Sequence, residues 1–303
     1  MRILAEGLRF PEGPIAMPDG SVVLVEIERE TLSRVTPDGK VHVVAKVPGG
    51  PNGAALGPKG RVFVCNNGGF DWIRLNDGMR PHGQPKSYVS GSIDVVDPER
   101  GTVEKLYDRC GDNLLKGPND IVFDAHGGFY FTDLGKRRGR EMDRGFVFWA
   151  KADGSHIREV ISFMLTPNGI GLSPDGKTLY VAETETARLW AFEVTAPGEI
   201  RKLPWPSPHG GRIVAGLGGY RRFDSLAVTS SGRICVAGVD SASIIEIGPD
   251  GTLVREHPAP DLLVTNICFG GADLRTAFVT LSYAGKLATT EWHEAGLRLH
   301  HQL

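Results

Sequence analysis

A fixed spacing of eight residues between a polar side chain and a turn glycine recurs along the chain, and it restricts the fold more than any other feature. Five copies keep this spacing without a gap: Glu12 to Gly20, Asn52 to Gly60, Asn119 to Gly127, Asn168 to Gly176, and Asp224 to Gly232. A sixth copy begins at Thr265, with Asp273 at the turn position and one residue inserted nearby. Apolar, alternating segments lie on both sides of each turn, which is typical of a β-hairpin.

Most copies continue with a third strand, a second turn and a fourth strand, as in "GSIDVVDPERGTVEKLY" and "SASIIEIGPDGTLVREH". The Asp-Gly and Pro-Asp-Gly steps supply the positive φ that tight turns need. Four short strands repeated six times are typical of a β-propeller, whose blades bury their faces on one another. We therefore predict an all-β, six-bladed propeller with four-stranded blades, forming a single domain over residues 1–303. An eight-stranded sandwich or a β-helix is the alternative, but neither explains four strands in every repeat.

The last blade leaves one question open. The segments "RILAEG" near the N-terminus and "LRLHHQL" at the C-terminus can each supply an outer strand there. We expect the two ends of the chain to meet in this blade, and the sequence does not determine which of them contributes the outermost strand.

Composition narrows the class of partner. The chain has 303 residues, is 23% charged, and carries a formal net charge of −2, so there is no basic stripe for nucleic acid. No apolar run approaches the roughly 20 residues that cross a bilayer, and "MRILAEGLRF" lacks the apolar segment of a signal peptide. We expect a cytoplasmic protein that binds neither nucleic acid nor membrane, and that is a monomer or a weak homo-oligomer.

The six polar residues at the start of the repeats should gather at one mouth of the central channel, because the first strand of each propeller blade lines that channel. They are two carboxylates, three amides and a hydroxyl: Glu12, Asp224, Asn52, Asn119, Asn168 and Thr265. Such oxygen donors suit Ca²⁺, Mg²⁺ or Mn²⁺ better than they suit Zn²⁺, whose tetrahedral sites are built mainly from nitrogen and sulfur ligands. The alternative is that these residues only bond their own turn backbone, and it holds best for Asn52 and Thr265, which could bind channel water.

Two long insertions should lie on the same face as this mouth. They run from Asn66 to Ser90 and from Leu134 to Arg144. The first is 25 residues long and has no strand pattern, and loops of that length in compact domains are usually functional or disordered. Trp72 and Tyr88 could wall a pocket over the metal, and the alternative is a solvated loop on the rim.

Several motifs, in the same order, make the chain similar to the gluconolactonase, senescence-marker-protein and luciferin-regenerating-enzyme family. They are "PEGP", "GPNDIVFDAHGGFYFTD", "PNGIGLSPDGKTLYVAET", "FDSLAV" and "TNICFGG". The resemblance implies a six-bladed propeller, commonly a lactone hydrolase, with one divalent metal at the channel mouth. By motif it implies metal ligation by Glu12, Asn168 and Asp224, while Asn119 ligates the metal or orients substrate. Ser225 lies where some relatives have a further oxygen ligand.

Two departures leave the substrate open. Ile15 and Ala16 stand where the family often has aromatic residues, and the insertion after Cys65 is longer than in sugar lactonases. The resemblance implies hydrolysis of a small-molecule lactone, with Asp224 or a metal-activated water as the base and with Asn119 and Asn52 orienting the carbonyl or the water. Arg221 could contact the substrate. We expect Ca²⁺, with Mg²⁺, Mn²⁺ or Zn²⁺ as the other choices. Hydrolysis of organophosphate triesters and a non-catalytic calcium-binding propeller are the alternatives.

Overall fold

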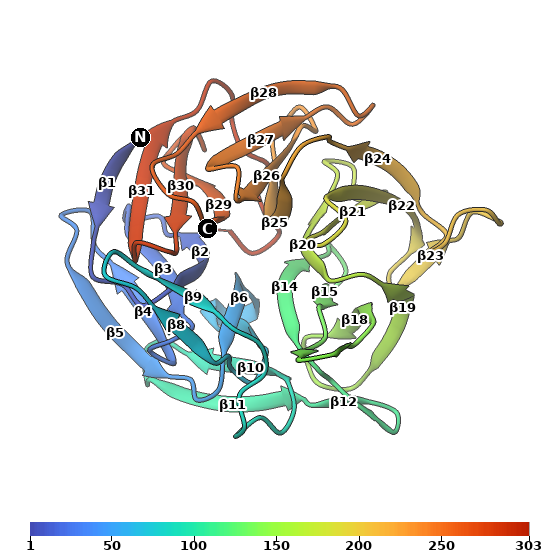
Figure 1. The fold of residues 1–303 in the computed structure, drawn as a ribbon, viewed down its shortest axis with the longest axis horizontal. Helices are drawn as coiled ribbons and strands as arrows, with labels where there is room; N and C mark the ends of the chain where they lie inside the picture. The colour runs from blue at the N-terminus through green and yellow to red at the C-terminus, as the bar shows by residue number, and fades with distance from the viewer. Residues whose placement is uncertain (303) are drawn as a thin grey trace.

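The computed structural model describes residues 1–302 and consists almost entirely of antiparallel strands arranged in a ring (Figure 1). Within that range the strands form six blades, as the repeat predicts. The first strand of each blade lies nearest the centre of the ring, because it is at the inner end of its sheet and contacts the first strands of the neighbouring blades. No helix in the described range is long and apolar enough to span a bilayer.

The strand boundaries follow the repeats closely. Blades one to three are β2 (Pro11–Ala16), β3 (Val22–Glu26), β4 (Thr31–Val35) and β5 (Val41–Lys46); β6 (Pro51–Leu56), β7 (Val62–Asn66), β10 (Ser92–Asp97) and β11 (Thr102–Tyr107); and β14 (Pro118–Phe123), β15 (Gly128–Asp133), β18 (Gly145–Lys151) and β19 (Ile157–Met164). A short 3-10 turn, η1 (Pro58–Gly60), joins β6 to β7. Between blades two and three, β12 (Arg109–Cys110) and β13 (Asn113–Leu114) form a small hairpin.

The second half of the chain repeats this plan. Blades four to six are β20 (Pro167–Leu172), β21 (Thr178–Glu183), β22 (Arg188–Ala196), β23 (Glu199–Arg201) and β24 (Arg212–Gly216); β25 (Arg222–Val228), β26 (Ile234–Val239), β27 (Ser243–Ile247) and β28 (Leu253–Pro258); and β29 (Val264–Gly270), β30 (Thr276–Leu281), β31 (Lys286–Glu291) and β1 (Arg2–Ala5). Blade four has an extra strand, because β23 and β24 each pair with a different part of β22.

The N-terminal segment closes the ring. β1 pairs antiparallel with β31, with Arg2 opposite Thr289 and Ile3 opposite Ala288, so it is the outermost strand of blade six. In Figure 1 the N-terminus lies beside β31, whereas the C-terminus lies inside the ring. Within residues 1–302 only the N-terminal segment contributes a strand to the last blade, so the two ends of the described chain have different roles.

The hydrophobic core is divided among the seams between blades. Across residues 1–302, six clusters of buried side chains each combine residues of two neighbouring blades. Between blades two and three, for example, the ring of Phe63 meets Phe123 edge to face at 5.1 Å and Phe129 at 5.5 Å. Because each seam buries apolar surface from both sides, the ring holds its inner strands in fixed positions.

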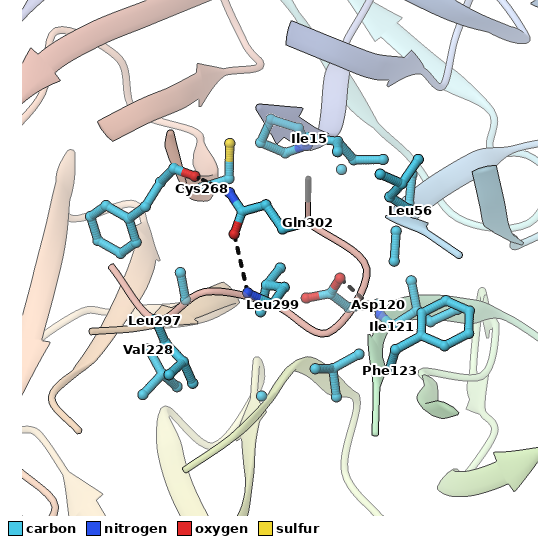
Figure 2. A pocket seen from close by; sticks show the side chains of 18 of the residues that line it. Ile15, Leu56, Asp120, Ile121, Phe123, Val228, Cys268, Leu297, Leu299 and Gln302 are labelled. Carbon is cyan, nitrogen blue, oxygen red and sulfur yellow. Dashed lines mark hydrogen bonds between the residues drawn. The ribbon is translucent and has the colours of Figure 1, made fainter. Parts of the chain in front are cut away.

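The C-terminal segment lies in the end of the channel that is remote from the starts of the inner strands. Leu297, Leu299 and Gln302 line a cavity of about 100 Å³ together with apolar residues of the inner strands, among them Ile121 and Val228 (Figure 2). The amide of Gln302 donates to the Phe269 carbonyl oxygen at 2.8 Å and thereby ties the segment to β29. This segment covers the far mouth of the channel.

Candidate metal centre

Each inner strand has a one-residue irregularity at the predicted polar position. In β20, Asn168 and Gly169 lie opposite the single residue Ala182 of β21, and the five other inner strands also have one extra residue at the polar position or directly after it. A β-bulge of this kind interrupts the alternation of the strand and re-aims its side chains, and bulges are common next to active sites. The bulge is the local reason that a polar residue can begin an otherwise apolar strand.

The residue after each polar position is also constrained. In blades one, two and four it is glycine, and a Cβ on Gly53 would lie 2.3 Å from the Asn119 carbonyl oxygen of the next blade. Likewise a Cβ on Gly169 would lie 2.6 Å from the Asp224 carbonyl oxygen, so a side chain does not fit. The other three blades have a polar residue there: Asp120, Ser225 and Asn266.

In blades one to four, a second repeated device fixes the segment that precedes the polar position. The last residue of the second strand is a buried carboxylate or amide that accepts a backbone N–H from just before the inner strand. The bonds are Arg9 to Glu26 at 2.7 Å, Gly50 to Asn66 at 2.8 Å, Gly117 to Asp133 at 2.6 Å, and Leu165 to Glu183 at 2.7 Å. The polar residues of blades one to four are thus held on well-defined backbone, as a binding site requires.

Three carboxylates influence one another at this mouth. Burial raises the pKa of Glu12 to about 7, against hydrogen bonds from Asn266, the Gly13 N–H and Thr265. Burial and then the charge of Glu12 raise the pKa of Asp120 to about 7. The pKa of Asp224 is raised for the same two reasons, while a hydrogen bond from Asn168 acts in the opposite direction. Glu12, Asp120 and Asp224 thus lie close enough for their charges to interact, and the sequence analysis did not name Asp120.

The amide groups at the same mouth are not fully satisfied. Asn168 donates its Nδ2 to the Thr184 hydroxyl at 3.1 Å, and its Oδ1 is buried without a hydrogen-bond partner. The Oδ1 of Asn119 is also buried and unpartnered. Buried unpaired acceptors cost free energy, and mutually repelling buried carboxylates do as well. A hard divalent cation would relieve both, so the residues present fit such an ion.

Asn52 and Thr265 have different surroundings. Both are buried, and Asn52 lies in the bulge of β6. The Thr265 hydroxyl shares hydrogen bonds with Thr280, at 2.9 Å, and with Ser282, and the Ser282 hydroxyl in turn donates to the Pro11 carbonyl oxygen at 2.6 Å. Thr265 therefore belongs to a hydrogen-bonded group that supports the segment carrying Glu12.

The 66–90 insertion contains a hairpin, although its sequence shows no strand pattern. β8 (Trp72–Arg74) pairs with β9 (Met79–Pro81), and this hairpin crosses in front of blade one in Figure 1. Two three-residue strands are too short to give an alternating pattern that can be read from sequence. Trp72 packs on Phe10 at 5.1 Å, and the Met79 N–H donates to the Tyr283 carbonyl oxygen at 3.0 Å.

Lys136 connects this insertion to the loop that follows β15. That loop includes a second small hairpin, β16 (Arg137–Arg138) with β17 (Glu141–Met142). The buried Lys136 Nζ donates to the Gly69 carbonyl oxygen at 2.7 Å and faces the rings of Phe70 and Tyr88, at 4.6 and 5.0 Å from their centroids. Burial lowers the pKa of Lys136 to about 7, although the nearby carboxylates of Asp133 and Asp143 act in the opposite direction.

The other two predicted substrate residues have protein partners. Tyr88 donates its hydroxyl to the Lys116 carbonyl oxygen at 2.7 Å, which fixes the end of the insertion next to the start of β14. Arg221 forms an ion pair with Glu256 of the outermost strand β28 at 2.8 Å. The structure thus directs Arg221 toward the outer edge of blade five, and it does not bring this side chain to the channel.

Comparison with known proteins agrees with the family resemblance that the sequence motifs indicate. A sequence model described as the SMP-30/gluconolactonase/LRE-like region matches residues 10–283. Lactonase drp35 of Staphylococcus saprophyticus is 28% identical over 86% of this chain and 72% of its own length. A gluconolactonase of Zymomonas mobilis is 24% identical, covering 93% and 79% of the two chains. Among solved structures, the calcium-binding protein regucalcin of Agrobacterium tumefaciens has the same fold, with a TM-score of 0.73 at 19% identity over 98% and 97% of the two chains.

Proposed function

Because the chain belongs to the SMP-30/gluconolactonase/LRE-like family, we propose that it hydrolyses a small lactone with the help of one divalent metal at the channel mouth. The proposal that this mouth is the site rests on one observation. Buried carboxylates and unpartnered amide oxygens converge there, and only hydrogen bonds from amide, hydroxyl and backbone groups act to lower the pKa values of Glu12, Asp120 and Asp224. The names of the two lactonase relatives support the reaction class.

Glu12, Asn119, Asn168 and Asp224 would hold the ion. All four offer oxygen atoms, which favours Ca²⁺ over Zn²⁺, and the description of the regucalcin structure as calcium-binding supports the same choice. When bound, the ion would polarise the lactone carbonyl as a Lewis acid. Asn266 would keep Glu12 in place, since its Nδ2 donates to Glu12 Oε2 at 2.9 Å.

Asp224 is the carboxylate best suited to take a proton. Although burial raises its pKa, Asp224 is the least buried of the three carboxylates, since Glu12 is only 3% and Asp120 only 7% exposed. General-base assistance of this kind typically contributes about 10²–10⁴ to the rate. The Asn119 side chain can donate through its amide nitrogen to an oxygen of the lactone while its Oδ1 faces the ion. Asn52 would bind the substrate or the attacking water beside it.

The rim would select the substrate. Trp72 and Tyr88 belong to the insertion that crosses this face. Trp72 packs on Phe10 and meets the ring of Phe70 edge to face at 6.0 Å, and Tyr88 is held by the Lys116 carbonyl oxygen. We therefore assign Trp72 and Tyr88 to the wall around the lactone ring. Arg221 is left out of this assignment because Glu256 pairs with it.

The test is hydrolysis of a panel of sugar and aliphatic lactones, followed with a pH indicator before and after chelation. We expect turnover to vanish with the chelator and to return with Ca²⁺ when Ca²⁺, Mg²⁺, Mn²⁺ and Zn²⁺ are added back separately. Absence of turnover with every lactone and every ion would refute the proposed activity. Full turnover after chelation would instead refute the role of the metal.

A further inference from the structure

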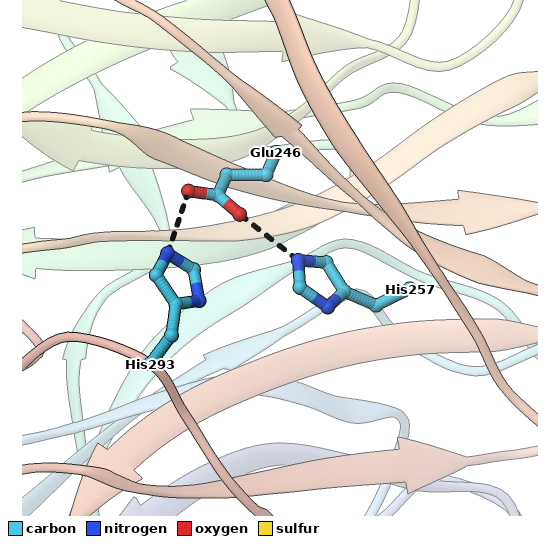
Figure 3. Close-up of side chains that lie close together, drawn as sticks. All are labelled: Glu246, His257 and His293. Carbon is cyan, nitrogen blue, oxygen red and sulfur yellow. Dashed lines mark hydrogen bonds and ion pairs between the residues drawn. The ribbon is translucent and has the colours of Figure 1, made fainter.

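A second group of potential metal ligands lies on the seam between blades five and six, away from the channel. Glu246 comes from β27, His257 from β28, and His293 from the residues just after β31 (Figure 3). The ligand atoms of these three side chains all lie within 4.8 Å of one another. Nε2 of His257 is 2.9 Å from Glu246 Oε2, and Nε2 of His293 is 3.2 Å from Glu246 Oε1.

Packing holds the three ligands in place. Glu246 is fully buried, which limits its rotamers. The His257 ring lies against the ring of Trp292 at 4.1 Å and is nearly parallel to the ring of His293, with an interplanar angle of 9°. Trp292 is 2% exposed, and its backbone N–H donates to the Arg275 carbonyl oxygen at 2.7 Å, so the backbone next to His293 is fixed as well.

A guanidinium group now balances the charge of this cluster. Arg233 Nη1 donates to Glu246 Oε1 at 2.9 Å and lies 3.2 Å from His293 Nε2. A fourth candidate ligand is present in Glu294, whose Oε1 is 3.9 Å from His293 Nε2 and 3.7 Å from Arg233 Nη1. That Oε1 is buried and has no hydrogen-bond partner. The Arg233 guanidinium therefore lies against Glu246, His293 and Glu294, while His257 contacts the other carboxylate oxygen of Glu246.

We propose that Glu246, His257, His293 and Glu294 form a second metal site, which takes a dication of the zinc class in exchange for Arg233. Two nitrogen and two carboxylate donors suit Zn²⁺ or Co²⁺, whereas the oxygen-only channel mouth suits Ca²⁺. The two carboxylates would neutralise the ion once the guanidinium has moved away. The Arg233 side chain can move into solvent because it is already 38% exposed.

The site would fasten one part of the ring to another. Glu246 and His257 belong to blade five, while His293 and Glu294 begin the segment that leads to the far mouth of the channel. Binding of an ion to the folded state alone would stabilise this seam by mass action. The proposal does not depend on lactone hydrolysis, and the two can fail separately.

The test is titration of the untagged full-length chain with Co²⁺, read as visible ligand-field absorption, and with Zn²⁺, read as competition against Co²⁺ and as a shift in Tm. Wild type and the channel variant Asp224→Asn should both show the Co²⁺ bands. His257→Ala and His293→Ala should weaken binding by at least the roughly 10- to 100-fold that loss of a supporting group at a metal site costs. His42→Ala, at an exposed histidine of blade one, is the matched control and should bind as wild type does.

Arg233→Gln makes the test two-sided. Removing the competing cation should tighten Zn²⁺ binding about tenfold or more and enlarge the Tm shift on addition of Zn²⁺. A general loss of folding would instead weaken binding, so the sign of the change separates the two explanations. Binding that is equal in wild type, His257→Ala and His293→Ala would overturn the proposal, and so would weaker binding in a folded Arg233→Gln variant.

Discussion

The two mouths of the channel are lined by the same six inner strands and differ in almost every other respect. At one mouth the strands begin with bulged polar residues, and unpartnered amide oxygens lie near mutually repelling carboxylates. At the other, apolar residues of the same strands and the C-terminal segment close the cavity. The difference shows that one extra residue in a strand is enough to place polar side chains at one end of it and mostly apolar side chains at the other.

The largest expected effect is at the polar mouth. Asn168→Ala and Asp224→Ala should each lose the metal and the lactonase activity together, with a decrease in kcat/KM of at least about a hundredfold. Metal content by elemental analysis and turnover would be measured on the same samples. Full turnover in a folded, metal-free variant would show that the reaction takes place elsewhere.

A change at the far mouth should affect stability and leave activity nearly unchanged. Ending the chain after Gly296 removes the covering segment, and because it exposes apolar residues of the channel it should lower the free energy of unfolding by about 2 kcal/mol. At a temperature where the variant is folded, metal content and kcat should stay within about twofold of wild type. A large loss of activity with stability unchanged would mean that the far mouth takes part in the reaction. Denaturant unfolding and the lactone assay distinguish the outcomes.

The next prediction concerns Lys136, under the rim of the polar mouth, and its effect is smaller when taken per pH unit. Its pKa is lowered to about 7 in the folded protein. Between about pH 7 and the ordinary pKa of lysine, the unfolded chain therefore holds the proton and the folded protein does not. The lysine therefore destabilises the fold fully below pH 7, and this penalty disappears as the pH rises from about 7 toward its ordinary value of about 10.4. Relative to Lys136→Met, the stability of wild type should increase by up to about 1.4 kcal/mol per pH unit in this window. Parallel slopes for the two proteins would contradict the assignment.

The smallest effect should come from the wall of the site. Trp72→Ala removes a ring that packs on Phe10 and Phe70 but contributes no proposed metal ligand. We expect KM to change by a few-fold, to different extents for sugar and aliphatic lactones, with metal content unchanged. Loss of the metal in this variant would show that the insertion supports the ligands and does not only select the substrate.

Much of the fold was predictable because its cause is periodic. The eight-residue spacing predicted six inner strands and their turns, and the structure places Glu12, Asn168 and Asp224 at one mouth. Asp120 and Asn266 were missed because, in a regular strand, their side chains would lie on the opposite face from Asn119 and Thr265. A bulge interrupts this alternation, and it leaves no mark in the sequence composition. A second set of polar residues does recur at the ends of the second strands: Glu26, Asn66, Asp133 and Glu183. A search for polar residues 14 or 15 positions after the polar residue that begins each repeat could have found them.

The features that the sequence did not reveal depend on long-range contacts. Nothing local distinguishes "RILAEG" from "LRLHHQL" as an outer strand, because that choice is made by pairing with β31. Likewise Glu246 and His293 are 47 positions apart, and their proximity follows only from the packing of blade five against blade six.

The pairing of β1 with β31 has a consequence for biosynthesis. Arg2 and its partner Thr289 are separated by nearly the whole chain. At roughly 5–20 residues per second, the ribosome needs on the order of half a minute to deliver that partner after β1 has emerged. During this interval β1 has no sheet to join, and the seam between blades six and one lacks one of its sides. The nascent chain therefore exposes an unpaired strand to other proteins in the cell until the last blade has been translated.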